Sequence, residues 1–341
     1  MIKSIAELTE KELYSKKVLL RVDFNVPILD GEIAEQYRIK ANKETIDFLM
    51  NHGAIIGLVS HITAIDSFEP ILNQVKKVLS IDLDFINDCI GESVEISLNS
   101  AKPGDIFLLE NVRKYEGEEK NDINFAKNLA EPFDLYINNA FSASHRNHAS
   151  LVAITKFLPS YAGFLLIKEI FNLDKILKSP KENKTLIIGG NKIDTKLPVI
   201  KSFIDKAEHI LIGGAITENM LKKNSCIIFP KDYVSENGAI SDIGPETIKE
   251  FIEIINNSKT IIWNGPLGKV EEEKFSIGSK KMSEAIINSG AFSVVGGGDT
   301  IAFLEKLVLI DKFNYVSTGG GAMLEFLAGS KLPGLIALEY D

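Results

Sequence analysis

Five short apolar runs in the second half of the chain each end directly in glycine, and this repeated pattern constrains the fold more than any other feature. The runs lead to glycines at 189–190, 213–214, 265, 296–298 and 319–321. Uninterrupted apolar strands are typical of a parallel sheet buried on both faces. In open α/β sheets, the carboxyl ends of such strands line the edge where ligands bind. The pattern therefore predicts five glycine turns along one edge of a parallel sheet.

The last of these runs shows what such an edge can do. A strand at 315–317 stops at three glycines, and apolar residues at helical spacing follow until Gly329 offers a C-cap. Glycines let backbone N–H groups approach a ligand, and the helix N-terminus behind them carries a partial positive charge. A tight turn that needs positive φ would explain one glycine cluster equally well. The repetition of such clusters after five apolar runs favours an anion-binding edge. The fingerprints GxxxxGK[ST] and GxGxxG are both absent.

Size and composition limit the class of protein. A chain of 341 residues is long enough for two domains with separate cores. It has no apolar run of membrane-spanning length and begins without a signal-like segment, so we expect a cytoplasmic protein. Cys89 and Cys226 are too few for a disulfide framework or zinc site and are expected to be buried. The net charge of -9 argues against a nucleic-acid or membrane-surface binder.

Arginine is used sparingly and in one half of the chain. Only four of the 38 basic residues are arginine, and all precede residue 150: Arg21, Arg38, Arg113 and Arg146. A planar guanidinium binds phosphate or carboxylate with two parallel hydrogen bonds, which lysine cannot do. Codon usage could explain the scarcity of arginine, but less easily the neighbourhoods in which the four remain.

Those neighbourhoods alternate between strands and helices. We predict strands at 18–27, 54–60, 105–112 and 134–141, and helices at 38–49, 70–79 and 125–129. Alternation implies parallel βαβ units with a crevice at the strand ends. A structural role is the commoner alternative for any single histidine, but the set favours an anion site formed by Arg21, Arg38, His61, Arg113, His145 and Arg146.

A helix expected at 165–177 separates this half from the glycine-rich half. The predicted fold is thus α/β, with two Rossmann-like domains, each a mainly parallel sheet flanked by helices, joined by a hinge helix. An arginine-rich anion site in one domain and a phosphate-binding edge in the other suggest two phosphorylated substrates.

These motifs together resemble the phosphoglycerate kinases nearly from end to end. The matching stretches are RVDFNVP at 21–27, LENVR at 109–113, GEEKND at 117–122, AF with HR and HAS within 140–150, WNGPLG at 263–268, GGGDT at 296–300, and STGGGA at 317–322. The resemblance implies reversible phosphoryl transfer from 1,3-bisphosphoglycerate to ADP, giving 3-phosphoglycerate and ATP with Mg²⁺ as cofactor.

The resemblance also assigns residues to the two substrates. The glycerate and its stable phosphate would contact Asp23, Phe24, Asn25, Arg38, His61, Arg113 and Arg146, with Arg21 and His145 in the surrounding basic patch. The nucleotide would contact Gly190, Lys192, Lys196, Gly214, Gly265, Glu271, Gly297, Gly298, Asp299 and Thr300. Among these, Glu271 matches the glutamate on the ribose, Asp299 would hold Mg²⁺, and Thr300 would contact a nucleotide phosphate.

The chemistry of the transfer is consistent with these assignments. The acceptor is a carboxylate that is already deprotonated at neutral pH, so no general base is required. The reaction instead needs neutralisation of the migrating phosphoryl oxygens. The residues expected to supply it are Arg38, Lys192, Lys196, Gly320 and Gly321.

By the same resemblance, we expect four segments and few partners. Residues 1–160 would bind the glycerate substrate, 161–180 form the connecting helix, 181–328 bind the nucleotide, and 329–341 return to the first domain. The expected partners are ATP or ADP and 3-phosphoglycerate or 1,3-bisphosphoglycerate. We expect a monomer that binds neither nucleic acid nor membrane.

The chain also departs from the family pattern. Where the family has Ser-His-Leu-Gly-Arg-Pro, residues 60–65 read SHITAI, so Ala64 stands in place of a phosphate-binding arginine. The region 221–242 is short and only 226–234 is expected to be a strand. Ala215 replaces a glycine, Asn139 an aspartate, and Lys269-Val270 a hydrophobic pair.

Two other function classes remain open, the first of them because of the missing arginine and the shortened loops. One is a catalytically impaired relative that binds nucleotide or phosphometabolite without phosphoryl transfer. The other is a dinucleotide dehydrogenase, which the lack of GxGxxG with an acidic ribose anchor disfavours. The intact lysines, Asp299 and glycine turns favour an active kinase.

Overall fold

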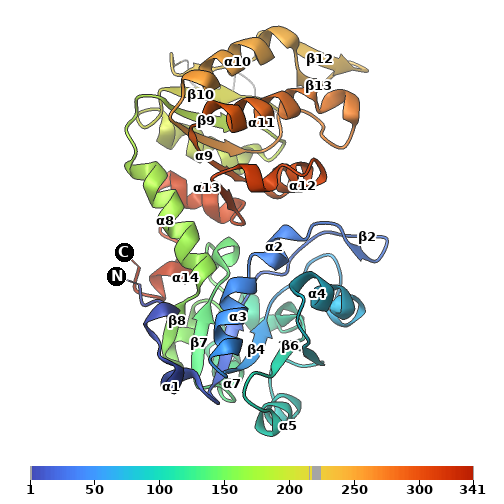
Figure 1. Ribbon diagram of the computed structural model, residues 1–341, viewed down its shortest axis with the longest axis vertical. Coiled ribbons are helices and arrows are strands. Elements are labelled where there is room, and N and C mark those ends of the chain that lie inside the picture. The colour runs from blue at the N-terminus through green and yellow to red at the C-terminus, as the bar shows by residue number, and fades with distance from the viewer. Residues whose placement is uncertain (1, 215, 217–223, 341) are drawn as a thin grey trace. The chain divides into compact units, whose positions relative to one another are not determined.

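The computed structural model describes residues 2–214, 216 and 224–340 (Figure 1). By its internal contacts the chain divides into two compact units. Unit 1 contains the residues up to Glu169 together with the segment from Lys331 onward, and unit 2 runs from Ile170 to Ser330. Each unit contains a six-stranded parallel sheet of its own. The predicted α/β class with two sheets is confirmed.

Unit 1 is built on the strand order β5-β6-β4-β1-β7-β8. Its six strands are β1 Lys17–Arg21, β4 Ile55–Val59, β5 Asp84–Ile86, β6 Ile106–Leu109, β7 Leu135–Asn138 and β8 Ser160–Ala162. A small hairpin, β2 Ile28–Leu29 and β3 Glu32–Ile33, stands beside it. Its helices are α1 Glu10–Leu13, α2 Tyr37–Lys40, α3 Lys43–Asn51, α4 Leu72–Leu79, α5 Glu92–Ser100, α6 Glu116–Glu119, α7 Ile123–Ala130 and α14 Pro333–Ile336, with short 3₁₀ turns between them.

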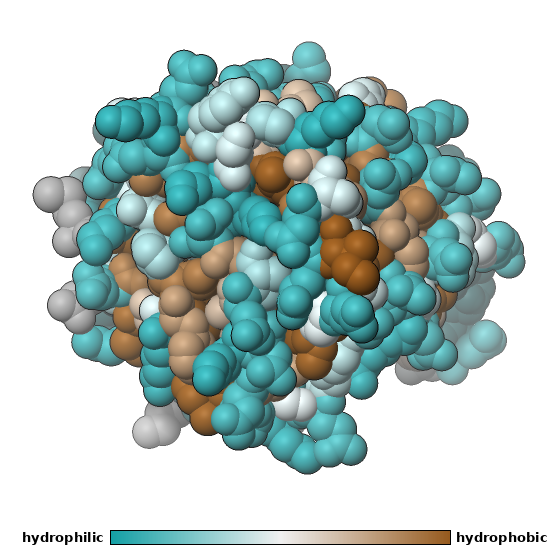
Figure 2. Space-filling view, turned by 90° about the horizontal axis from the view of Figure 1, so that it is seen from below, coloured by the Kyte–Doolittle hydropathy of each residue, from teal (hydrophilic) through white to brown (hydrophobic). Residues whose placement is uncertain are grey.

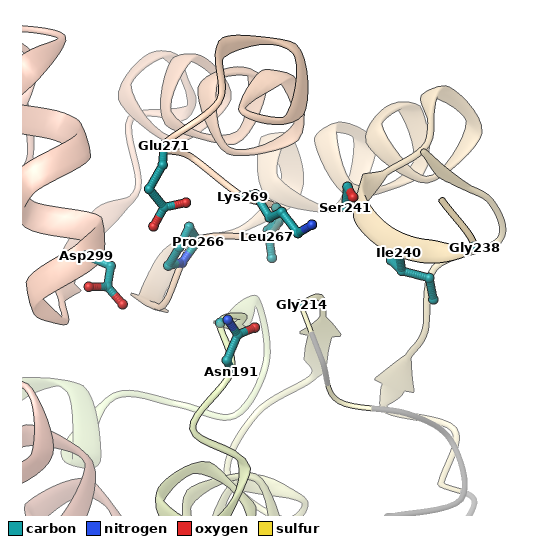
Figure 3. A pocket seen from close by; sticks show the side chains of 12 residues that line it. Asn191, Gly214, Gly238, Ile240, Ser241, Pro266, Leu267, Lys269, Glu271 and Asp299 are labelled. Atoms are coloured by element: carbon teal, nitrogen blue, oxygen red, sulfur yellow. The ribbon is translucent and has the colours of Figure 1, made fainter. Parts of the chain in front are cut away.

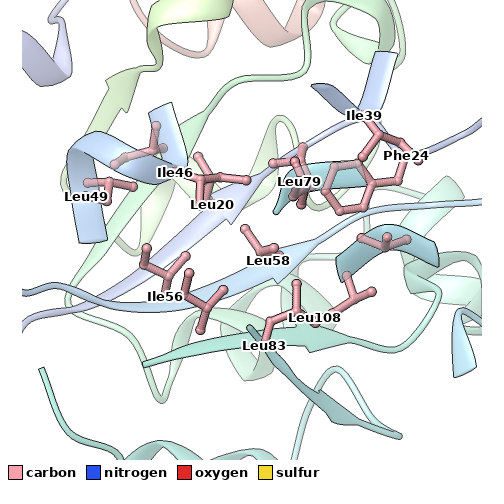
Figure 4. Close-up of a cluster of buried hydrophobic side chains, with 14 of the residues drawn as sticks. Leu20, Phe24, Ile39, Ile46, Leu49, Ile56, Leu58, Leu79, Leu83 and Leu108 are labelled. Carbon is pink, nitrogen blue, oxygen red and sulfur yellow. The ribbon is translucent and has the colours of Figure 1, made fainter. Parts of the chain in front are cut away.

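Both faces of this sheet are covered by apolar side chains. On one face Leu20 and Leu58, which are paired across β1 and β4, pack with Leu49 of α3 (Figure 4). On the other face Leu19 packs in a second cluster that includes Leu129 of α7. Successive residues of a strand point to opposite faces, so β1 contributes to both clusters. This explains why its sequence is apolar without alternation.

Several strands are shorter than the sequence suggests. The strand predicted at 18–27 ends at Arg21, because the Asp23 carboxylate accepts the N–H of Asn25 and the Ser60 hydroxyl accepts that of Phe24. These bonds to side chains replace the backbone hydrogen bonds between strands, and a loop begins there. Similarly, the strand predicted at 105–112 ends at Leu109, and the one predicted at 134–141 covers only β7.

The helix predicted from 38 to 49 is two helices. α2 ends at Lys40 and α3 begins at Lys43. The Asn42 side chain between them donates to the Arg38 carbonyl at 2.9 Å. Such side-chain bonds compete with the helical pattern, and they allow α2 to take its own direction.

Unit 2 has the strand order β11-β10-β9-β14-β15-β16, again parallel throughout. These strands are β9 Lys184–Ile188, β10 His209–Ile212, β11 Ile227–Ile228, β14 Thr260–Asn264, β15 Phe292–Gly296 and β16 Tyr315–Ser317. Five of them end in the predicted glycine turns, so that prediction is confirmed. The helices are α9 Ile193–Phe203, α10 Pro245–Asn257, α11 Ile277–Ser289, α12 Gly298–Lys306 and α13 Gly321–Ala328.

The strand predicted at 226–234 was wrong in extent. β11 is followed by an antiparallel hairpin, β12 Tyr233–Glu236 and β13 Ala239–Ile243, whose turn holds Asn237 and Gly238 at positive φ. Asparagine and glycine are the residues that favour a two-residue hairpin turn. Ala215 and residues 217–223 lie outside the described residues.

The connecting helix is α8, Phe164–Lys178, close to the predicted range. The division between the units falls inside it, after Glu169. At its C-terminus, the buried Lys184 ammonium donates to the carbonyls of Ile176 and Ser179 at 2.8 and 2.7 Å. A cation there satisfies orphan carbonyls and complements the helix dipole.

The C-terminal segment belongs to unit 1. The Gly334 N–H of α14 donates to the Ser144 carbonyl at 2.8 Å, and Leu335 is buried. Among the described residues, no helix is both long and apolar enough to cross a membrane. In Figure 2, hydrophilic side chains separate the apolar ones into small patches on the face shown.

Candidate active-site residues

The anion-site residues of unit 1 follow four neighbouring strands. Asp23 and Asn25 follow β1, His61 follows β4, Arg113 follows β6, and Arg146 lies in the loop beyond β7. The carboxyl ends of parallel strands meet at one edge, so the topology brings these residues together. The charges of Arg21, Arg38, Arg113 and His148 all act on His61, so these side chains lie near it.

Arg38 reaches this edge from α2. Its Nε lies 3.7 Å from the Asp23 carboxylate and 4.0 Å from that of Glu35, and its Nη1 donates to the Asn25 carbonyl. Glu35 also accepts the N–H of Arg38, which fixes the start of the helix. The guanidinium is therefore held on one side by acceptors of the protein itself.

Four buried nitrogens at this edge lack a hydrogen-bond partner in the part of the chain that the structure describes. They are Nε of Arg38, Nε2 of His61, Nε of Arg113 and Nδ1 of His145. A buried polar group without a partner costs about 1–3 kcal/mol, so native proteins rarely keep one without a reason. A bound anion with several oxygens would satisfy these groups together.

Electrostatics at this edge also favour an anion. Burial, reinforced by the charges of Arg21 and Arg113, lowers the pKa of His61 well below its ordinary value. Burial and the same two arginines lower the pKa of His148 to about 4. Burial lowers the pKa of Arg113 as well. The site thus disfavours further positive charge, and an anionic ligand would relieve the repulsion.

Two predicted residues of this set lie in the interior. The Phe24 side chain is fully buried, and its ring meets that of Phe68 edge-on at 6.5 Å. It belongs to the core, so its side chain is not available to a ligand. Arg21 is also buried, with its Nε donating to the Ser150 hydroxyl at 2.9 Å. Arg21 therefore contacts other side chains of the site, such as His61, from the interior. We had expected it in the basic patch around the substrate.

Sequence reasoning assigned no role to Glu118, His148 or Ser150, which lie in this cluster. Glu118 is fully buried and accepts from the backbone and hydroxyl of Ser150. His148 Nδ1 lies 3.7 Å from its carboxylate. The only sequence signal for these three residues was their place in the family stretches GEEKND and HAS. Because glutamate is normally exposed, the sequence by itself did not indicate that one of three acidic residues there is internal.

Unit 2 contains a cavity of about 410 Å³ at the glycine edge (Figure 3). Four of the predicted nucleotide residues line it, namely Gly190, Gly214, Glu271 and Asp299. Its other lining residues were not predicted: Asn191, Gly238, Ile240, Ser241, Pro266, Leu267, Gly268 and Lys269. Figure 3 shows the Glu271 and Asp299 carboxylates on one side and Ile240 and Ser241 on the other.

Three glycine turns of this edge pack directly against one another. A Cβ on Gly265 would lie 2.2 Å from the Gly189 carbonyl oxygen, and one on Gly214 would lie 2.4 Å from the Gly190 nitrogen. Gly190, Gly214 and Gly265 also have positive φ. Both the backbone conformation and the close approach therefore require glycine here.

Lys196 lies beneath these turns. Its side chain is buried, and its ammonium donates to the Gly189 carbonyl. Burial lowers its pKa to about 8, although the Asp299 carboxylate opposes this and Lys192 adds to it. Lys192 is exposed at the N-terminus of α9. Lys196 is thus buried with a lowered pKa, whereas Lys192 is exposed to solvent.

The remaining predicted nucleotide residues sit at helix starts. Gly297 precedes α12, Gly298 begins it, and Gly320 and Gly321 take the same two places at α13. Thr300 is buried, and its hydroxyl accepts the N–H of Gly265 at 3.0 Å. In this structure Thr300 holds the glycine turn, and its contact with a phosphate stays a prediction.

The shortened region forms one wall of the cavity. The buried Asp242 of β13 accepts the N–H groups of Ile243 and Gly278, at 2.9 and 2.8 Å, and burial raises its pKa. Lys269 donates its N–H to the Ser241 carbonyl and is exposed. The hairpin is therefore tied to the loop that carries Glu271, despite its short length.

Comparison with known proteins points to one family. The family model described as "Phosphoglycerate kinase" matches residues 8–231 and 222–330, two stretches that overlap within the shortened region. The phosphoglycerate kinase of Dictyoglomus turgidum is 40% identical over 391 residues, covering 99% of each chain. That of Borreliella burgdorferi is 40% identical over 378 residues, covering 95% of this chain and 96% of the relative.

Solved structures give the same result. The crystal structure of phosphoglycerate kinase from Pyrococcus horikoshii OT3 has a TM-score of 0.90 at 30% identity, covering 99% of this chain and 98% of that one. The enzyme from Coxiella burnetii has a TM-score of 0.80 at 30% identity, with 99% of both chains covered.

The chain is a short relative of these proteins. Its alignment with the Dictyoglomus protein spans 391 positions, whereas it has 341 residues, so at least 50 positions there have no counterpart here. The matches nevertheless run from end to end and include both units. The chain belongs to the phosphoglycerate kinase family.

Proposed function

We propose that this protein catalyses reversible phosphoryl transfer from 1,3-bisphosphoglycerate to ADP, giving 3-phosphoglycerate and ATP. The observation that carries the proposal in unit 1 is the group of buried nitrogens of Arg38, His61, Arg113 and His145 that make no hydrogen bond within the described part of the chain. Such donors fit the carboxylate and phosphate of a phosphoglycerate. In unit 2, the glycine-lined cavity with Glu271 fits a nucleotide.

The groups around the transfer act by positioning and charge. In the direction that consumes ATP, the nucleophile is the carboxylate of 3-phosphoglycerate, which requires no deprotonation. Arg38, Lys192, Lys196 and the N–H groups of Gly320 and Gly321 neutralise the oxygens of the migrating phosphoryl group. Glu271 binds the ribose hydroxyls, and Thr300 contacts a nucleotide phosphate.

Asp299 fits the metal that such a nucleotide carries. Its carboxylate is exposed and lines the cavity, while no group of three metal-binding side chains exists among the described residues. Mg²⁺ in nucleotide sites is typically held by one or two carboxylates together with phosphate oxygens. When bound, the ion would neutralise phosphate charge, and Asp299 would orient it.

The reaction also implies motion. Water would hydrolyse an acyl phosphate, so the substrates must meet in a water-free state. We propose α8 as the hinge helix for that closure. The comparisons provide no support for the alternative of a catalytically impaired relative. The expected cytoplasmic location and monomeric state stay predictions.

A coupled assay of ATP-dependent phosphorylation of 3-phosphoglycerate with Mg²⁺ tests the proposal. Lys196→Ala removes a buried cation beside the glycine turns and should lower kcat by about a hundredfold or more. Lys201→Ala, at an exposed position of the same helix, serves as the matched control and should retain the wild-type rate. Binding of ATP without any turnover by the wild-type protein would contradict the proposal.

A further inference from the structure

His61 makes a contact whose chemistry determines where its proton lies. Its Nδ1 lies 3.2 Å from Nη2 of Arg21, and both side chains are buried. A guanidinium has only donors and stays charged under all ordinary conditions. The Nδ1 atom must therefore accept, which places the imidazole proton on Nε2 and leaves the ring neutral.

Arg21 is itself fixed by two other contacts. Its Nη1 donates to the Val22 carbonyl at 2.5 Å and its Nε to the Ser150 hydroxyl at 2.9 Å. The Ser150 hydroxyl then donates to the Glu118 carboxylate at 2.6 Å, and the Ser150 N–H donates to the other carboxylate oxygen at 2.8 Å. An unbroken chain of buried hydrogen bonds thus runs from Glu118 to His61.

The far end of this chain is open. Nε2 of His61 is buried and has no hydrogen-bond partner among the described residues. The charged and titratable groups that act on His61 are Arg21, Arg38, Arg113 and His148, and all of them disfavour a second proton on it. A protonated ring would also turn Nδ1–H toward a donor of Arg21. The ring can therefore offer a hydrogen bond to an anion without carrying charge.

We propose that Glu118 and Ser150 are positioning residues that lock Arg21, and that Arg21 holds His61 as the Nε2–H tautomer facing the anionic substrate. This inference rests on the proposed function only in identifying the anionic substrate as the phosphoglycerate. A neutral donor binds the same anion throughout the physiological pH range, whereas a cationic histidine would release it as pH rises.

Nuclear magnetic resonance of the ligand-free protein, labelled with ¹⁵N-histidine, tests the tautomer without any enzyme assay. We expect His61 to remain one neutral Nε2–H tautomer from about pH 5 to about pH 8. A His61 ring that titrates within this range, or that is protonated on Nδ1, would overturn the proposal. This result stands whether or not the protein transfers phosphate.

Ser150→Ala tests the positioning chain. It should raise the Michaelis constant for 3-phosphoglycerate by about three- to tenfold, leave that for ATP unchanged, and introduce a second tautomer of His61. Ser150→Thr keeps the hydroxyl and should restore the single tautomer. Ser283→Ala removes an equally buried hydroxyl that donates to two backbone carbonyls of its own helix, and it should change neither readout. A single unchanged tautomer in Ser150→Ala would refute the chain.

Discussion

Lys196 shows how burial sets the working range of a single residue. Its pKa is lowered to about 8, so the ammonium is charged at neutral pH and loses its proton as pH rises through that value. Because the cation is the form that neutralises phosphate, kcat/KM for MgATP should fall above about pH 8, by up to tenfold per pH unit.

The pH profile of kcat/KM measures this directly. Lys196→Arg keeps its charge in alkaline solution, so any residual activity of this variant should lack the decline. A wild-type profile that stays flat to about pH 10 would show that Lys196 does not limit the reaction there.

Ala64 is the second residue with a specific expectation. It is exposed in the loop after β4, beside Thr63, whose N–H and hydroxyl both donate to the Asn25 side chain at 2.9 Å. An arginine at 64 would add a charge-assisted bond worth about 1.5–3 kcal/mol, so Ala64→Arg should lower the Michaelis constant for 3-phosphoglycerate about ten- to a hundredfold.

Steady-state kinetics with varied 3-phosphoglycerate test this expectation. Ala64→Gln supplies a long polar side chain without charge and should have a much smaller effect. An unchanged Michaelis constant in Ala64→Arg would mean that the absent arginine has no consequence for binding.

At the scale of elements, the glycine turns of unit 2 must fit one another as well as a ligand. A methyl group on Gly214 would overlap the backbone of Gly190, and no side-chain movement can relieve a clash between two backbones. Gly214→Ala should therefore separate the turns after β9 and β10 and raise the Michaelis constant for ATP at least about tenfold.

Gly290→Ala provides the matched control. Gly290 also has positive φ, but no atom of the described residues lies within 4 Å of an added Cβ, and Gly290 is not among the residues that line the cavity. Its substitution costs backbone strain of about 1 kcal/mol without displacing a turn, so it should lower the melting temperature and leave KM unchanged. Equal effects of the two variants on KM would show that strain alone matters.

At the scale of the whole molecule, the last helix stabilises the unit in which the chain begins. Leu335 of α14 is buried, whereas its neighbour Ile336 is half exposed. Leu335→Ala should destabilise unit 1 by about 2–5 kcal/mol, and Ile336→Ala should cost under about 1 kcal/mol.

The single tryptophan makes this prediction measurable by unit. Trp263 lies in β14 of unit 2, so its fluorescence follows that unit, while circular dichroism follows both. In denaturant, Leu335→Ala should shift the first part of the dichroism transition and leave the Trp263 transition in place. A parallel shift of both signals would mean that the two units unfold as one.

Much of this molecule follows from local sequence. The apolar runs at 184–188 and 260–264 become buried parallel strands because only a sheet covered on both faces accepts such runs. Gly329 ends α13 in the left-handed conformation for which glycine is suited. The family resemblance pointed to the lysines, Asp299 and the arginines as site residues.

Only the tertiary structure decided which polar groups are buried and what they contact. Glu118, Ser150 and Arg21 are separated by 32 and 129 residues, yet form one hydrogen-bonded chain. Burial lowers the pKa of Lys196, and Nε2 of His61 is buried without a hydrogen-bond partner among the residues that the structure describes. Periodicity and local conformational preference are properties of neighbouring residues, so the sequence alone indicated the buried parallel strands and their glycine turns, although not all their bounds. Desolvation and hydrogen bonding between distant residues depend on the packed chain, so the protonation and orientation of the site were decided there.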